Sequence, residues 1–322
     1  MDHFLSPLAH ALPALLQPLL LLAAAPLLVA WIRRVKARLQ NRRGAPLLTP
    51  YRELRKLLGK EAVVARTASP LFRIAPYVVF AATLLAAAAL PVLSTLLPGA
   101  RVADAIALIG LLGLARIMLT LAGLDAGTPF GGMGASREML VTTFAEPALL
   151  LVVFTLAMTT HTTNLASMAA STLAGDSVLR PSYMFALAAL LLVGVAECGR
   201  IPVDNPSTHL ELTMIHEGML LEYSGRHLAL MEWAAQLKLA LFAVLTVDLF
   251  LPWGLATRLT PLTLLGALAA LVLKLAALGA LLAVSETVLA KMRLFRVPGF
   301  LAMAFLLALL GLFAHVILES AL

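Results

Sequence analysis

The chain has 322 residues, of which 61% are hydrophobic and 13% are charged. A soluble domain carries roughly 45–50% apolar and about 25% charged residues, so this composition excludes a soluble globular protein, a disordered chain and a collagen-like repeat. The single cysteine, Cys198, excludes a disulfide-rich secreted scaffold. A mean hydropathy of +0.96 indicates a polytopic integral membrane protein whose side chains are solvated largely by lipid.

The formal net charge is +7, but the basic residues are unevenly distributed. Twelve of the 24 Lys and Arg lie between Arg33 and Arg73. A basic stretch directly after an apolar run is the usual topology signal of a membrane protein and can attract anionic lipid headgroups. The charge therefore points to a lipid bilayer and not to nucleic acid.

Eight hydrophobic runs approach the roughly 20 residues that a helix needs to cross about 30 Å of hydrocarbon. The fifth is the shortest. The sequence thus predicts an all-α polytopic integral membrane protein, with residues 1–322 forming a single transmembrane domain. The runs are Leu12–Ile32, Ile74–Leu97, Val102–Leu124, Pro147–Ala169, Ser182–Ala196, Ala234–Leu251, Leu262–Val284 and Gly299–Leu318.

The first run is followed, not preceded, by positive charge, so we expect an uncleaved helix with its N-terminus outside. Eight crossings then place the C-terminus outside as well. The predicted inner loops, about 33–73, 125–146, 197–233 and 285–298, hold 18 basic residues against three in the outer loops. This asymmetry predicts an inner (cytoplasmic) membrane protein with both termini periplasmic.

The first inner loop contains Tyr51–Leu58, which has the pattern of a short basic amphipathic helix at the membrane interface. A solvated charged linker is the alternative interpretation.

The third inner loop, 197–233, holds the densest polar sequence. Gly199 and two prolines should end the preceding helix. Thr208 followed by Glu211 fits a capping box, and Gly225 is placed to end the helix that starts there. The sequence therefore predicts a helix of about four turns over His209–Ser224. Within this region Glu197 and Glu211 adjoin an apolar span, where a carboxylate is costly unless it is used.

Three enzyme signatures are incomplete in this sequence. In the segment His216–Leu220, Leu220 occupies the position of the second His of a zinc-protease motif. Gly131–Gly134 lacks the Lys-Ser/Thr ending of a phosphate-binding loop. One cysteine cannot hold an iron–sulfur cluster, which generally needs four thiolates. We therefore predict no metal, no redox cofactor and no catalytic residue in this chain.

Charged residues also fall inside the predicted spans. At 1.5 Å per residue, Lys238 lies about 6 Å deep, Asp248 about 21 Å, Lys274 about 18 Å and Glu286 at the boundary. These depths predict two ion pairs, Asp248 with Lys274 and Lys238 with Glu286. Arg116 lies roughly 14 Å deep. Intramembrane charges commonly serve ion paths, whereas structural pairing of helices is the alternative; we give both equal weight.

The loop sequences resemble a known family. The pattern Glu197-x-x-Arg200-x-Pro202-x-Asp204, followed by an acidic helix that ends in Glu222-Tyr223, resembles the membrane-anchor subunit of complex I, the one called subunit 1 in mitochondria. The run Gly199–Pro206, followed by Thr208–Glu217, carries the finer match, which is to the counterpart of this subunit in group 4 membrane-bound [NiFe] hydrogenases, namely formate hydrogenlyase subunit 4 and hydrogenase 4 component C. Leu124–Met139 and Ala145–Pro147 resemble the same branch. Cys198 departs from the pattern, because Asn is commoner there.

This resemblance implies a non-catalytic anchor whose partners are hydrogenase large and small subunits and antiporter-like membrane subunits. The nickel-iron centre and iron–sulfur clusters would lie in those partners, and redox chemistry there would be coupled to proton or sodium movement. The alternatives are a quinone-site subunit of a complex I-type dehydrogenase and a stand-alone secondary ion transporter. The sequence shows no convincing internal repeat of the kind that transporters often have.

Two sets of candidate residues follow. The coupling or partner interface comprises Asp125, Arg137, Glu138, Glu146, Glu197, Arg200, Asp204, His209, Glu211, His216, Glu217, Glu222 and Tyr223. The ion-path candidates are Arg116, Lys238, Asp248, Lys274 and Glu286.

Overall fold

The computed structural model describes residues 2–65, 68–96, 104–175, 180–204, 214–258 and 260–319. Within these ranges the named elements are all helices. The elements are α1 (Asp2–Leu39), α2 (Thr49–Leu58), α3 (Pro70–Ala88), α4 (Ala105–Asp125), α5 (Pro129–Thr160), α6 (Leu165–Ala174), α7 (Pro181–Glu197), α8 (His216–Leu220), α9 (Gly225–Phe250), α10 (Pro261–Val288), η3 (Leu294–Arg296), α11 (Val297–Ala314) and η4 (His315–Glu319).

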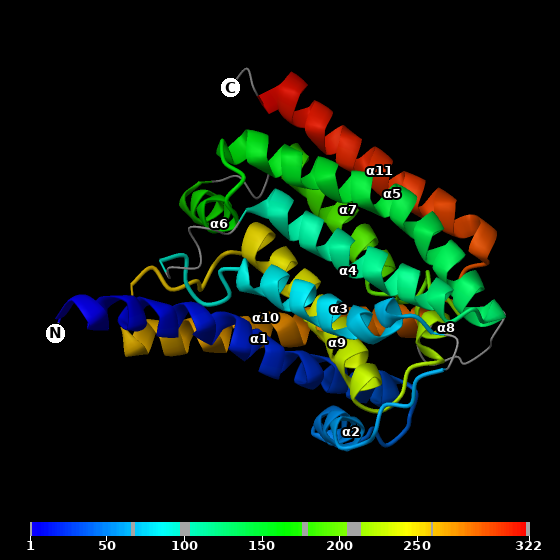
Figure 1. Cartoon of the computed structure of the whole chain (residues 1–322). Helices are drawn as coiled ribbons and strands as arrows, with labels where there is room; N and C mark the ends of the chain where they lie inside the picture. Colours follow the sequence, from blue (N-terminus) through cyan, green and yellow to red (C-terminus); the bar gives the residue numbers. More distant parts are fainter. Residues whose placement is uncertain are drawn as a thin grey trace.

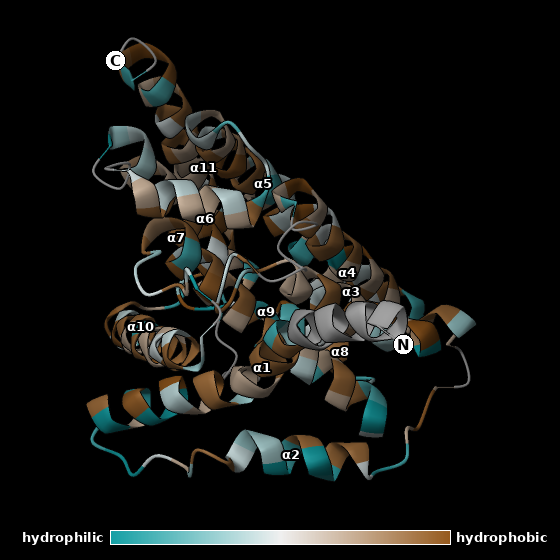
Figure 2. Ribbon diagram, turned by 90° about the vertical axis from the view of Figure 1, so that its left-hand side faces the viewer, coloured by the Kyte–Doolittle hydropathy of each residue, from teal (hydrophilic) through white to brown (hydrophobic). Residues whose placement is uncertain are grey.

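Helices α3, α4, α5 and α11 run in similar directions (Figure 1), while α1 crosses α5 and α11 in the view of Figure 2. In the described part of the chain, seven helices are long and apolar enough to cross a membrane, and α7, with 17 residues, is a shorter apolar helix. Both chain ends lie at the same end of the bundle, and α8 lies at the other. The all-α polytopic fold is therefore confirmed, while the side of the membrane on which the termini lie stays a prediction.

The fourth span differs from its predicted limits, Pro147–Ala169. Helix α5 starts at Pro129 and ends at Thr160, and α6 is a separate helix. The segment 125–146, expected as a loop, is therefore largely helical. Thr128 caps the start of α5 by accepting a hydrogen bond from the Gly131 amide at 3.3 Å. Hydropathy could not find this start because the first turns of α5 are rich in glycine and polar residues.

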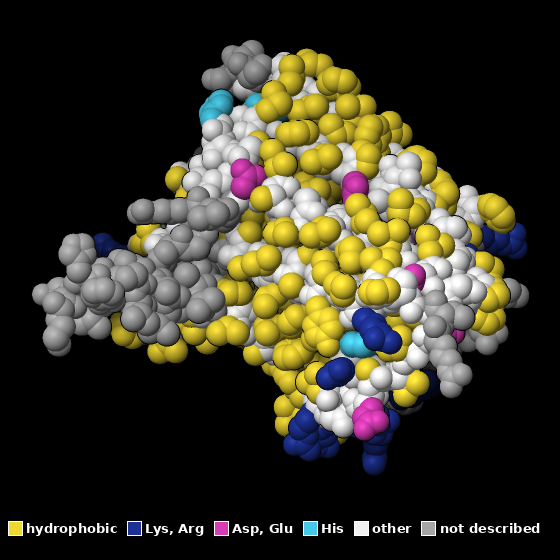
Figure 3. Space-filling view, in the orientation of Figure 1, with side chains coloured by type: hydrophobic (Ala, Val, Ile, Leu, Met, Phe, Trp, Pro, Cys, Tyr) yellow, Lys and Arg dark blue, Asp and Glu magenta, His cyan; other side chains and the backbone are white. Residues whose placement is uncertain are grey.

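Helix α2 confirms the short helix expected near Tyr51. Pro50 and Leu54 are buried, and the basic residues face outward. Its hydrophilic residues contrast with the apolar helices above it (Figure 2). Lys and Arg gather over this end of the molecule, whereas the flanks of the bundle are largely hydrophobic (Figure 3).

The helix predicted over His209–Ser224 is not formed as expected. In the described part of this loop, helix covers only His216–Leu220. Gly225 does not end it: with φ +53°, Gly225 begins α9. A side chain there would place Cβ 2.3 Å from the carbonyl oxygen of Glu61, so close packing and not helix termination requires this glycine. The proposed capping box, Thr208 with Glu211, lies outside the described residues.

The end of α7 follows the prediction. Gly199 has φ +56°, and its amide donates to the Ala196 carbonyl at 3.0 Å. The Arg200 amide donates to the Val195 carbonyl, also at 3.0 Å. This is the left-handed glycine termination common at helix C-termini, and it separates Glu197, still in the helix, from Arg200, which follows the turn.

Helix α1 packs against both α9 and α10, which contact each other much less. The Trp233 indole of α9 donates to the Leu22 carbonyl of α1 at 3.1 Å. The Trp31 indole of α1 donates to the Ala276 carbonyl of α10 at 3.0 Å. Helices α9 and α10, although consecutive in sequence, are therefore not each other's main packing partners. Their charged residues consequently meet partners on other helices.

A candidate functional site: a buried charge cluster beside a polar cavity

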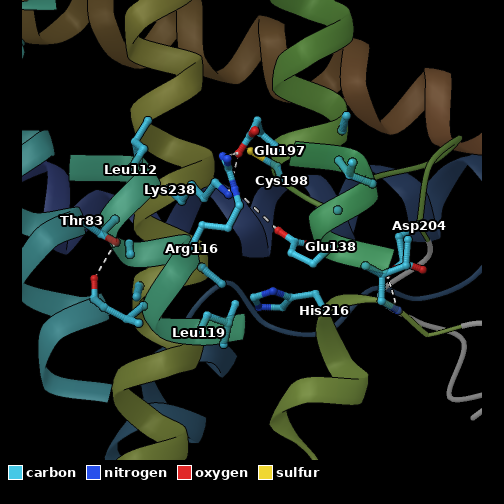
Figure 4. A pocket seen from close by; sticks show the side chains of 18 of the residues that line it. Thr83, Leu112, Arg116, Leu119, Glu138, Glu197, Cys198, Asp204, His216 and Lys238 are labelled. Carbon is cyan, nitrogen blue, oxygen red and sulfur yellow. Dashed lines mark hydrogen bonds and ion pairs between the residues drawn. The ribbon is translucent and has the colours of Figure 1, made fainter. Parts of the chain in front are cut away.

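Arg116 of α4 is the centre of a charge cluster inside the bundle (Figure 4). Its side chain is buried, with 4% of the residue exposed. The guanidinium hydrogen-bonds directly to Glu146 of α5 and to Glu197 of α7. Its Nε lies 3.8 Å from Oε1 of Glu138, also in α5. One arginine thus joins three carboxylates from two other helices.

Lys238 of α9 completes the cluster. Its Nζ lies 2.9 Å from Oε2 of Glu197, the oxygen that also accepts from Arg116. We call Arg116, Glu138, Glu146, Glu197 and Lys238 the charge cluster. Two cations oppose three carboxylates, so with every group ionised it carries a net charge of −1. One additional proton would make this cluster neutral; the Glu146 side chain is 35% exposed, so solvent screens part of the excess charge.

A cavity of about 70 Å³ adjoins the cluster and is lined by Arg116, Glu138, Glu197 and Lys238, together with Asp204 and His216. Two buried polar atoms, Oε1 of Glu197 and Nε2 of His216, have no hydrogen-bond partner among the described residues. One buried water needs roughly 10–15 Å³ of such space and two to four polar partners. The cavity is therefore large and polar enough to hold several hydrogen-bonding waters.

Glycines bring the short helix α8 to this cavity. A Cβ on Gly134 of α5 would lie 2.8 Å from the Ile215 carbonyl oxygen, and one on Gly123 of α4 would lie 2.9 Å from Met219. Arg137 anchors the same segment by donating to the Met214 carbonyl at 2.8 Å. These contacts position the residue after Ile215, His216, at the cavity wall.

Asp204 lies at the loop side of the cavity. Its Oδ1 lies 2.6 Å from Nζ of Lys291, and its Oδ2 accepts from the Ile215 amide at 3.3 Å. The Met292 amide donates to the Pro202 carbonyl at 2.9 Å. The loop after α7 is thus tied to the segment after α10, a link that the sequence did not reveal because Lys291 looked like a topology signal only.

Glu286 forms a second charged group with different partners from those predicted. The depth argument paired it with Lys238, and this is wrong. Glu286 Oε2 lies 2.9 Å from Nζ of Lys36, and Oε1 lies 3.3 Å from Nη1 of Arg200. Lys36, at the end of α1, was missed for the same reason as Lys291: it belongs to the basic stretch that reports orientation.

Asp248 and Lys274 interact electrostatically, but within the described ranges they form no direct ion pair. The Lys274 ammonium donates to the Leu251 carbonyl at 2.5 Å and to the Trp253 carbonyl. These carbonyls follow the C-terminus of α9, where positive charge is favourable. Asp248 is buried, and its Oδ2 has no partner in the described part of the protein.

The remaining interface candidates lie away from the charge cluster. Asp125, the last residue of α4, accepts from the Ser69 amide at 2.8 Å. Tyr223 is buried, donates to the Phe72 carbonyl at 3.0 Å and stacks on the Phe72 ring at 4.0 Å. Glu222 is exposed, and Glu217 lies in α8 without lining the cavity. His209 and Glu211 lie outside the described residues.

His216 has the electrostatic environment of a neutral imidazole. Burial lowers the pKa of His216 below its ordinary value, and the positive charge of Lys238 lowers it further. A neutral imidazole has one nitrogen that donates and one that accepts. His216 therefore offers one donor and one acceptor nitrogen at the cavity wall.

Comparison with known proteins identifies the family. Residues 12–317 match the family model described as NADH dehydrogenase, so the chain belongs to that family. Within it, the chain is 37% identical over 298 residues to hydrogenase-4 component C of Escherichia coli (strain K12), covering 92% of this chain and 93% of that protein. It is 35% identical over 280 residues to formate hydrogenlyase subunit 4 of the same organism, covering 87% and 90%.

Two further similarities are weaker in sequence. A subunit of the NADH-quinone oxidoreductase of Rickettsia prowazekii (strain Madrid E) is 29% identical over 231 residues, covering 68% of this chain and 66% of that one. A chain in the structure of the membrane-bound sulfane sulfur reductase, an archaeal respiratory membrane complex, is 20% identical with a TM-score of 0.81 and covers 95% of this chain and 99% of that one. The family resemblance read from the loops is confirmed.

Proposed function

We propose that this chain is a non-catalytic membrane subunit of a hydrogenase-type, complex I-like assembly. It anchors hydrogenase large and small subunits and joins antiporter-like membrane subunits, while the nickel-iron centre and iron–sulfur clusters lie in those partners. The support is the similarity, over nearly the whole chain, to hydrogenase-4 component C and formate hydrogenlyase subunit 4. In the described residues no group of three His, Cys, Asp or Glu is arranged to hold a metal ion.

We further propose that the charge cluster couples redox events in the partner subunits to proton movement. The observation that carries this proposal is the cavity lined by Glu197 and His216, whose Oε1 and Nε2 atoms are buried without a hydrogen-bond partner among the described residues. Because the cluster has one carboxylate more than it has cations, it can gain and lose one proton at low electrostatic cost. His216 and Asp204, on the loop side of the cavity, connect it with the surface on which a hydrogenase arm would sit.

The coupling test uses the purified complex reconstituted in liposomes. We expect Glu197→Gln and Arg200→Ala to leave subunit content similar while lowering ion uptake per hydrogen produced. The matched control is Glu222→Gln, which alters an exposed carboxylate of the same loop. Normal ion uptake in both the Glu197→Gln and the Arg200→Ala variant would show that this region takes no part in coupling.

The same preparation separates the alternatives. A stand-alone transporter would move ions when the chain is reconstituted without partners. A quinone-site subunit would co-purify with a hydrogenase-like subunit that lacks nickel and would reduce added quinone. Mass spectrometry of the chains that co-purify in mild detergent, with metal analysis, distinguishes both from the proposed hydrogenase anchor.

The proposed orientation has its own test. We place the loops beside α2 and α8 in the cytoplasm and both termini in the periplasm, on the basis of the 18-to-three asymmetry of basic residues. In a Cys198→Ser background, single cysteines at Ser6 and Ser136 should react from opposite sides of the membrane. Labelling of residue 6 only from the cytoplasmic side would contradict the topology.

A further inference from the structure

A second cavity, which shares only Cys198 with the described lining of the first, lies between α1 and α10 on one side and α7, α9 and α11 on the other. Its volume is about 280 Å³, close to the lower limit of roughly 300 Å³ for small-molecule sites. The lining is apolar over most of its length, with Leu28, Leu190 and Phe242 among its walls. The polar side chains Arg200 and Ser285 lie at one end. Thr246, a further lining residue, donates its hydroxyl hydrogen bond within α9 to the Phe242 carbonyl at 2.8 Å.

This cavity is open to the lipid-facing surface of the bundle. Three of its lining residues are strongly exposed: Leu191 is 36%, Leu281 is 60% and Leu289 is 48% exposed. They come from α7, from α10 and from the residue directly after α10. A chain of methylene groups could therefore enter from the bilayer without crossing a polar barrier.

The polar end of the cavity is bordered by basic residues from three separate segments. Arg200 lines the cavity itself, and Ile32, another lining residue, is followed directly by Arg33 and Arg34. The Met292 amide hydrogen-bonds to the carbonyl of the lining residue Pro202, which brings the segment 291–296 to the same place. Arg293 and Arg296 of that segment are exposed.

The acidic residues at this end do not cancel the positive charge. Glu286 is shared between Lys36 and Arg200, so that group keeps one net positive charge when all three are ionised. Basic residues near a membrane surface attract anionic lipids. An apolar cavity open to the bilayer, with a basic cluster at one end, is complementary in shape and charge to an amphiphile with an anionic head.

We propose that this cavity is a specific binding site for an anionic phospholipid. One acyl chain lies between α7 and α10, and the phosphate-containing headgroup lies among Arg200, Arg293 and Arg296. The bound lipid fills the gap between the α1–α10 pair and the α7–α11 pair, and so connects parts of the bundle whose direct packing is incomplete.

The test uses the intact complex in liposomes that contain a phosphatidylglycerol probe with a photoreactive diazirine in the middle of one acyl chain. After illumination, peptide mass spectrometry maps the labelled residues. We expect the cavity-lining residues to be labelled several-fold more by this probe than by a phosphatidylcholine probe with the same chain. Arg293→Gln with Arg296→Gln should remove most of this headgroup preference.

The second part of the experiment fills the cavity with a larger side chain. Ala243 of α9 lines the cavity, so Ala243→Phe should lower the labelling several-fold. The control, Leu273→Phe, adds an aromatic ring on the outer face of α10, where Leu273 is 72% exposed, and should leave it unchanged. If Ala243→Phe does not assemble, Leu278→Trp fills the same cavity from α10.

Equal labelling by the two lipids, or unchanged labelling in an assembled cavity-filling variant, would overturn the proposal. It would also fail if a long-chain quinone displaced the probe while excess unlabelled phosphatidylglycerol did not, because the occupant would then be a quinone and not a lipid.

Discussion

Lys238 Nζ and Glu197 Oε2 lie 2.9 Å apart in the interior of the bundle, and the same oxygen accepts a hydrogen bond from Arg116. Both cations therefore use one oxygen of the carboxylate, and the other, Oε1, is buried without a hydrogen-bond partner in the described part of the protein. Through Oε2, Glu197 therefore joins α7 to α4 and to α9.

The first prediction concerns the stability of this arrangement. Glu197→Gln removes the negative charge shared by Arg116 and Lys238 but keeps a hydrogen-bonding group of the same shape, so it should destabilise the protein by less than the roughly 3–5 kcal/mol that loss of a buried ion-pair partner commonly costs. Lys238→Met combined with Glu197→Gln should cost less than the sum of the single changes. The measurement is thermal unfolding of the purified complex. The control is Glu53→Gln, whose exposed pair with Arg33 should contribute less than about 1 kcal/mol.

The second prediction concerns Lys274. Lys274→Met removes the hydrogen bonds to the carbonyls that follow α9 and should destabilise the protein by about 1–3 kcal/mol. Adding Asp248→Asn should not restore the loss, because those carbonyls stay without their donor. Thermal midpoints of the two single variants and the double variant test this order. Full recovery in the double variant would show instead that Asp248 and Lys274 act as a simple ion pair.

The third prediction compares two glycines of α5. Gly134→Ala places a Cβ 2.8 Å from the Ile215 carbonyl oxygen, so it should displace α8 at a cost of about 1–3 kcal/mol. Gly132→Ala meets nothing within 4 Å and should be neutral, or stabilising by roughly 0.4–1 kcal/mol, because alanine favours the helix. Thermal unfolding and ion uptake check both variants; equal effects would show that α8 does not depend on this contact.

The fourth prediction is a pH dependence that arises from His216. Because burial lowers the pKa of His216 in the folded protein, the unfolded chain binds the proton first, near pH 6.5. Stability should therefore fall as the pH is lowered from 7.5 through 6.5 towards the lowered folded-state pKa. His216→Gln should flatten this part of the curve of thermal midpoint against pH. An unchanged slope in the variant would assign the dependence to other groups.

Part of this architecture can be predicted from the sequence alone. The long apolar runs, the basic helix α2 and the glycine that ends α7 are local features, and each could be located because hydrophobic length and backbone conformation depend on neighbouring residues only. The candidates Arg116, Glu197 and Lys238 were also identifiable, because charge within or beside an apolar span is costly wherever the helix packs.

Predictions from local sequence patterns were wrong where contacts with distant segments determine the structure. Gly225 resembles a helix terminator, yet the approach of Glu61, more than 160 residues earlier, requires it. The first turns of α5 resemble a loop, because nothing in 129–146 shows that Gly131 and Gly134 lie against other backbone segments. A glycine required for close packing looks the same in the sequence as a glycine required for a turn. The two can be distinguished only when the segment that packs against the glycine is known.

The sequence determined the depth of each buried charge, and only the tertiary structure decided its partner. Depth is a single coordinate along the helix axis, and Lys238 and Glu286 agreed in that coordinate. The angular position around the bundle is set by which helices pack together. Because α1 packs against both α9 and α10, Glu286 meets Lys36 of α1 and Arg200 of the loop after α7, while Lys238 faces Glu197 of α7.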